Sequence, residues 1–166
     1  MEEPAKLWET MLEEAKKRAS GVVADFISLR SQNDLLRKAG IDWVLDTVIK
    51  FATDPRLRPP IEIMREEPHE FFDKSTRLVG QKLQLNQGLR CMILEAGWPR
   101  IPSDGFIRGG GLALVKIKHK GFSEKNVTLR LKREGDMLSW SAEKHDIAIC
   151  AVDEAYLLEH LAQLYV

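Results

Sequence analysis

The residues of this sequence best suited to binding an anion are lysines and arginines that recur at every second position. Lys116, Lys118 and Lys120 alternate with other residues in one segment, and Arg130 and Lys132 do so in a second. Alternate side chains of a β-strand point to the same face and lie roughly 6–7 Å apart, a spacing comparable to that of phosphates along a nucleic-acid strand. The pattern therefore predicts a sheet face that contacts phosphate groups.

The charge around these cations is uneven, although the chain as a whole is neutral. The 166 residues include 25 basic and 25 acidic ones, which argues against a protein that is basic overall. Between Phe106 and Arg133, however, eight Lys or Arg residues stand against one acid, Glu124. This local excess favours a polyanion, and duplex RNA in particular, because the predicted face has no aromatic side chain on which single-stranded bases stack.

Hydroxyl and cationic side chains near the two segments extend the predicted nucleic-acid-binding site. Hydroxyls on the same face can donate to phosphate oxygens or contact a 2′-hydroxyl, and flanking cations add charge. These additional residues are Thr128, Ser139, Ser141, Arg108 and Lys125.

A run of short strands must position these residues. Alternating apolar residues and turn signals predict an antiparallel meander of four strands, over residues 112–120, 126–133, 137–142 and 146–150. In the last of them, Ile147 and Ile149 are expected to point into the core and Ala148 outward. A closing helix is expected to begin at Asp153 and Glu154. Its packing stripe is expected to be Ala155, Leu158, Leu161, Ala162 and Tyr165.

Residues 1–98 are predicted to be mainly helical, with a helix end near Gly40 and a longer helix from Pro68 to Leu94. Residues 99–111 are rich in turn-forming residues and form a linking loop. The expected fold is α+β: a helical N-terminal region packed on one face of a C-terminal four-stranded antiparallel sheet, with a closing C-terminal helix. Residues 112–166 would share one core with the helical region.

Other motifs do not indicate an enzyme. Ser141-Ala-Glu-Lys144 matches the Ser-x-x-Lys signature of some acyl enzymes, but it stands at a strand end rather than at a helix start. The four histidines have no metal-ligand spacing, and the two cysteines form no Cys-x-x-Cys pair. Gly109–Gly111 lacks the strand and helix that flank phosphate-binding loops, which favours a hinge. The sequence thus predicts a non-enzymatic binding protein without a cofactor or metal.

A membrane-surface role is one alternative. The run Gly109–Trp140 resembles the opening strands of a pleckstrin-homology domain, in which Lys and Arg around the first turn bind phosphoinositide headgroups. The resemblance implies an acidic-lipid-binding module. That fold needs more strands before its closing helix than the remaining residues provide.

A protein-interaction or scaffold module is the other alternative. Trp8, Met11 and Leu12 on an N-terminal helix would contact a partner or a second copy. The basic face would then simply be solvated, as Lys-rich sheet faces often are. No run approaches the length of a membrane span, no signal-peptide core is present, and the isolated cysteines indicate a reducing compartment. A cytoplasmic or nuclear protein is therefore expected.

Overall fold

The computed structural model describes residues 13, 17 and 32–166. The helices predicted before residue 32, and the partner surface predicted at Trp8, Met11 and Leu12, lie outside the described residues. The chain divides into two units, Met1–Leu36 and Arg37–Val166. The sheet and the candidate site belong to the second.

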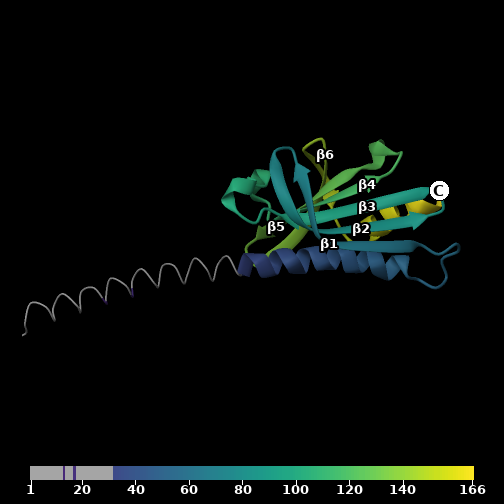
Figure 1. Cartoon of the computed structure of the whole chain (residues 1–166), viewed down its shortest axis with the longest axis horizontal. Helices are drawn as coiled ribbons and strands as arrows, with labels where there is room; N and C mark the ends of the chain where they lie inside the picture. The colour runs from purple at the N-terminus through teal and green to yellow at the C-terminus, as the bar shows by residue number, and fades with distance from the viewer. Residues whose placement is uncertain (1–12, 14–16, 18–31) are drawn as a thin grey trace, which may run out of the picture. The chain divides into compact units, whose positions relative to one another are not determined.

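A seven-stranded antiparallel sheet forms the centre of this unit, and its strands neighbour one another in chain order (Figure 1). The prediction of a four-stranded sheet under a helical N-terminal region is therefore wrong, although the fold is α+β. The strands are β1 (Glu62–Asp73), β2 (Thr76–Gln87), β3 (Arg90–Trp98), β4 (Ala113–His119), β5 (Val127–Glu134), β6 (Met137–Lys144) and β7 (Ile147–Ala151).

Strands β1 to β3 occupy the segment for which the sequence predicts a long helix. Leu83 and Leu85 on β2 are buried and alternate with partly exposed polar residues, a pattern that paired strands satisfy. A helix would carry Gly80 and Gly88 in its interior, at a cost of about 1 kcal/mol each relative to Ala. In the sheet, Gly80 faces Gly97 across the β2–β3 pair, and Gly88 lies in the connecting turn.

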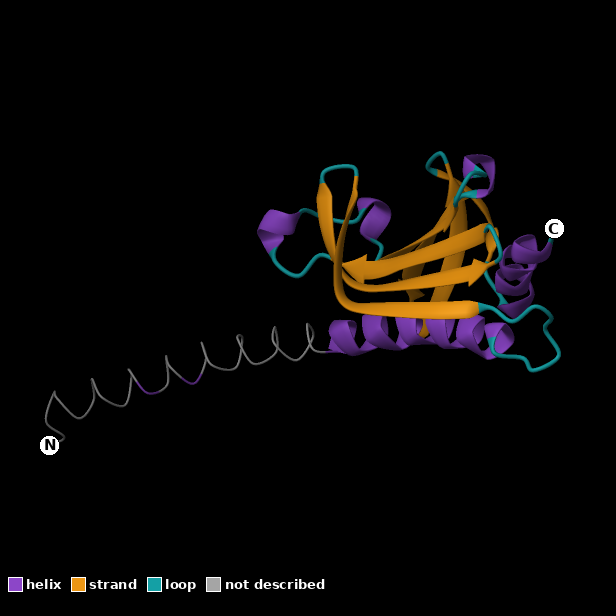
Figure 2. Ribbon diagram, turned by 45° about the vertical axis from the view of Figure 1, so that its right-hand side comes forward, coloured by secondary structure: helices purple, strands orange, loops and turns teal. Residues whose placement is uncertain are grey.

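A helix runs through residues 32–52, and the part of it that belongs to the second unit, residues 37–52, packs along the sheet (Figure 2). The predicted helix end near Gly40 is wrong, because this glycine is a point of close contact inside the helix. A Cβ at Gly40 would lie 2.7 Å from Leu131 Cδ2, and the Gly40 carbonyl accepts a 3.1 Å hydrogen bond from Trp140 Nε1. The buried face of the helix consists of Ile41, Val44, Leu45, Val48 and Ala52.

The predicted C-terminal elements agree well with β4 to β7 and with the closing helix α2 (Glu154–Ala162). The Asp153 carboxylate accepts a 2.8 Å hydrogen bond from the Tyr156 amide and so caps α2, which starts where the sequence predicts. The predicted packing stripe is largely wrong, since α2 turns Leu157 and Leu161 into the core while Leu158 is 44% exposed.

Strand β7 also differs from the prediction. Ile147 and Ile149 are 71% and 54% exposed rather than inward-facing. The strand is the last of the sheet and pairs only with β6, and Ile149 is an extra residue in that pairing. An outer strand with few neighbours cannot bury both of its faces.

Short 3-10 turns complete the unit. The predicted 99–111 loop contains two of them, and the others follow β4 and α2. They are η1 (Pro102–Asp104), η2 (Arg108–Gly110), η3 (Ser123–Lys125) and η4 (Gln163–Tyr165). Among the described residues, no helix is both long and apolar enough to cross a membrane.

Candidate anion-binding groove

Seven of the ten predicted binding residues belong to strands and share the open face of the sheet, the face opposite helix residues 37–52. They are Lys116, Lys118, Thr128, Arg130, Lys132, Ser139 and Ser141. The strand pairings place Lys116 beside Thr128 on β4 and β5, as alternation predicts. On β5 and β6, the pairings are Arg130 with Ser141 and Lys132 with Ser139.

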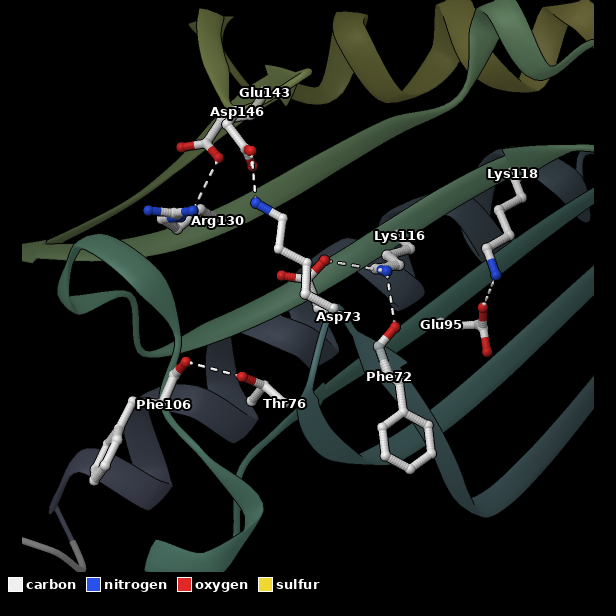
Figure 3. Close-up of polar contacts among 11 residues, drawn as sticks. Phe72, Asp73, Thr76, Glu95, Phe106, Lys116, Lys118, Arg130, Glu143 and Asp146 are labelled. Carbon is white, nitrogen blue, oxygen red and sulfur yellow. Dashed lines mark hydrogen bonds and ion pairs between the residues drawn. The ribbon is translucent and has the colours of Figure 1, made fainter.

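The end of the β1–β2 hairpin lies over part of this face (Figure 3). Lys116 Nζ donates a 2.8 Å hydrogen bond to the Phe72 carbonyl and lies 3.1 Å from Asp73 Oδ1. From the hairpin turn, Lys74 Nζ reaches Asp146 Oδ2 in the β6–β7 turn at 2.6 Å. The open face is therefore partly covered, and it is not the flat cationic ladder that the sequence predicts.

Lys118 belongs to a three-residue cluster on the open face. Glu95 on β3 has a side chain only 10% exposed, and its two oxygens lie 2.5 Å from Lys118 Nζ and 2.7 Å from His69 Nε2. Burial raises the pKa of Glu95, but the hydrogen bonds from His69 and Lys118 outweigh it and hold this pKa below its usual value. Glu95 is thus a buried carboxylate whose charge depends on both partners.

Arg130 is a buried residue rather than an exposed cation. Its side chain is 12% exposed, and its Nη2 lies 3.1 Å from Glu143 Oε2, which is buried as well. Arg130 Nε and the neighbouring Ser141 Oγ are buried without a hydrogen-bond partner. Gly109 passes directly over the guanidinium, since a Cβ there would lie 2.5 Å from Arg130 Nη1. Gly109 is thus packed on Arg130, which does not support the predicted hinge.

A groove of about 520 Å³ opens beside the covered part of the face. Lys116, Lys118 and Thr128 are the predicted site residues that line it. Lys144, whose Nζ donates to the Glu124 carbonyl, adds a third lysine. The remaining lining residues are Ile117, Ser123, Glu124, Asn126, Val127, Glu143 and His145.

The other predicted residues do not line this groove. Lys125 donates to Gln163 Oε1 after α2 and lies 5.7 Å from the Phe122 ring. Lys120 is exposed in the turn after β4, Arg108 is exposed in η2, and Lys132 and Ser139 lie together toward the far end of β5 and β6. The ten predicted residues are thus divided among several places.

Two exposed aromatic rings near the open face are absent from the sequence-based prediction. Phe72 is 56% exposed at the end of β1, and Phe106 is 78% exposed in the loop before η2. In Figure 3 the Phe72 ring points away from Lys116, and the Phe106 ring points away from Thr76, whose Oγ1 donates a 3.1 Å hydrogen bond to the Phe106 carbonyl. Neither ring lines the groove. The sequence pattern assigns Phe72 to the helix predicted from Pro68 and Phe106 to the linking loop, so neither is predicted to be part of the face.

The run that resembles a pleckstrin-homology opening forms β4, β5 and part of β6, in the middle of the seven-stranded sheet. The resemblance to opening strands therefore does not hold. In the described part of the chain, no group of three His, Cys, Asp or Glu residues is placed to hold a metal ion. Comparison with protein-family models, curated proteins and solved structures finds no match to this chain.

Proposed function

We propose that the protein is a non-enzymatic binding protein whose groove takes a phosphate-bearing strand, specifically single-stranded RNA. The observation that carries the proposal is the convergence of Lys116, Lys118 and Lys144 on one groove with Thr128 and Asn126 beside them. Ammonium groups and neutral hydrogen-bonding side chains together are what phosphate and ribose contacts require. A cytoplasmic or nuclear location forms part of the proposal.

The covered face favours a single strand over a duplex. The hairpin end and the Lys74–Asp146 bridge occupy part of the surface on which a double helix would rest. Phe72 and Phe106 lie outside the groove lining but are exposed, and we propose that a strand extending past the groove stacks unpaired bases on them, a contact worth about 1–3 kcal/mol per base. The duplex preference drawn from the sequence depended on the absence of such rings.

The existing ion pairs of the groove determine which of its lysines can contact a phosphate. Lys118 is 48% exposed, so its ammonium can turn from Glu95 to a phosphate. Lys116 is 20% exposed and is held by the hairpin end. Lys118 and Lys144 are therefore the groove lysines best suited to direct phosphate contact.

Fluorescence anisotropy with a labelled uridine-rich RNA, measured at several salt concentrations, tests the proposal. The variant Lys118→Gln/Lys144→Gln is compared with Lys38→Gln/Lys50→Gln, which removes the same charge from exposed helix positions. For single strands, each lost phosphate contact reduces the magnitude of the negative slope of log K against log salt by about 0.7, so the groove variant should reduce it by about 1.4. The control should retain the wild-type slope.

Duplex RNA and vesicles containing acidic lipid are the comparison ligands. Tighter binding of either one than of the single strand would contradict the proposed ligand. Equal slopes for the groove variant and its control would place the binding site elsewhere.

A second candidate function is contact with a second copy through β7. All five residues of this outer strand are exposed and uncharged, whereas the opposite outer strand, β1, carries several charges and Pro68. The free backbone groups along an exposed, uncharged outer strand can pair with the same strand of a second copy. Sedimentation velocity at rising concentration should show dimers for wild type and for the control Leu89→Lys, but not for Ile149→Lys.

A further inference from the structure

The cluster of Glu95, His69 and Lys118 connects the groove to a titratable pair. His69 and Glu95 have side chains 16% and 10% exposed, whereas that of Lys118 is 48% exposed and lines the groove. Lys118 is therefore the one member of this cluster that a ligand in the groove can reach. The other two stay where β1 and β3 hold them.

Withdrawal of the Lys118 ammonium would leave the Glu95 carboxylate with one partner. An unpaired buried carboxylate is costly, and the imidazole nitrogen already 2.7 Å away can supply a compensating charge if it takes up a proton. A proton that enters this hydrogen bond belongs to the His69–Glu95 pair as a unit. The added proton replaces the positive charge that Lys118 withdraws from Glu95.

The other charges around the pair must be considered as well. Lys82 on β2 and Lys116 on β4 face Glu95 directly in the strand pairings, and Glu66 on β1 faces Lys82. Lys116 is engaged by Asp73 and by the Phe72 carbonyl, so it is not available to Glu95. Lys82 is the side chain that would replace Lys118 without any proton.

We propose that binding of a phosphate group in the groove is coupled to uptake of one proton by the His69–Glu95 pair, an inference that rests on the proposed function of the groove. Lys118 exchanges the carboxylate for the phosphate, and the proton comes from solvent. Because the bound state carries the extra proton, affinity rises as the pH falls, by up to about tenfold per pH unit where the pair titrates.

The proton step can be tested without any ligand. Lys118→Met removes the ammonium as a bound phosphate would, and NMR follows the titration of the His69 imidazole in both proteins. In the variant, the imidazolium signal should persist to higher pH than in wild type, and Lys38→Met should titrate as wild type does. An unchanged titration in Lys118→Met would overturn the coupling, and it would point to Lys82 as the replacement.

Calorimetry with the uridine-rich RNA, in buffers of different ionisation enthalpy, tests the coupling in the complex. Wild type should take up close to one proton per bound strand, and His69→Gln, which retains a donor toward Glu95, should bind without proton uptake. Binding by wild type without proton uptake would overturn the coupling alone. If the RNA bound in no buffer, the proposed function of the groove would be wrong as well. The NMR titration would still test whether the His69–Glu95 pair responds to the loss of Lys118.

Discussion

The burial of the Arg130–Glu143 ion pair leads to a specific expectation for stability. Both side chains are nearly enclosed, 12% and 9% exposed, and they meet through one contact of 3.1 Å. Removal of one partner leaves the other charge buried and uncompensated, which costs about 3–5 kcal/mol for pairs of this kind. Arg130→Met and Glu143→Gln should therefore each lower the free energy of unfolding substantially.

The magnitude at this position should lie near the lower end of that range. Arg130 Nε and Ser141 Oγ are already buried without a hydrogen-bond partner, so the native pair is imperfectly satisfied. We expect each single variant to cost about 3 kcal/mol and the double variant to cost less than the sum, because neither charge is then left alone. The pair would thus be strongly coupled but contribute little net stability.

Urea denaturation followed by circular dichroism measures these differences, and unchanged m-values would show that the variants alter stability alone. Asp146→Asn is the matched control, since it breaks the exposed bridge to Lys74, whose side chains are 46% and 63% exposed. This control should change the free energy of unfolding little. Additive effects of the two buried substitutions would refute the coupling. If Arg130→Met were as stable as wild type but no longer bound RNA, Arg130 would instead be a residue that contacts the ligand.

Three further expectations concern individual positions. Gly109→Ala should destabilise the fold by about 1 kcal/mol more than Gly110→Ala in the same urea assay, because both have φ near +70° but only the first meets a side chain. Asp153→Ala should cost about 1 kcal/mol through loss of the α2 cap, seen as a lower urea midpoint. Burial and the nearby His119 lower the pKa of His160 to about 4. The neutral form is thus favoured in the fold, so stability should be full above pH 6.5 and fall by about 3 kcal/mol as the pH drops to 4. His160→Gln should remove this part of the acid sensitivity, and an unchanged pH profile would contradict it.

The open face shows why the candidate site was only partly predictable. Alternation placed Lys116 and Lys118 on the correct face of the correct strand, because the period of a strand is a local property. Their partners Asp73 and Glu95 come from strands that pair with β4 or reach over it from far earlier in the chain. Such contacts depend on the long-range pairing, and no local pattern predicts them.

The sequence by itself determined the α+β class, the boundaries of the C-terminal strands and the start of α2 at Asp153, because turn residues, strict alternation and caps act over a few neighbouring residues. The tertiary structure decided that residues 62–98 are strands, that Arg130 is buried, and that a hairpin covers part of the basic face. Segments with ambiguous periodicity adopt the form that pairs best with distant strands. Because of that pairing, the predicted row of exposed cations is instead a groove in which Lys116 and Lys118 are paired with Asp73 and Glu95.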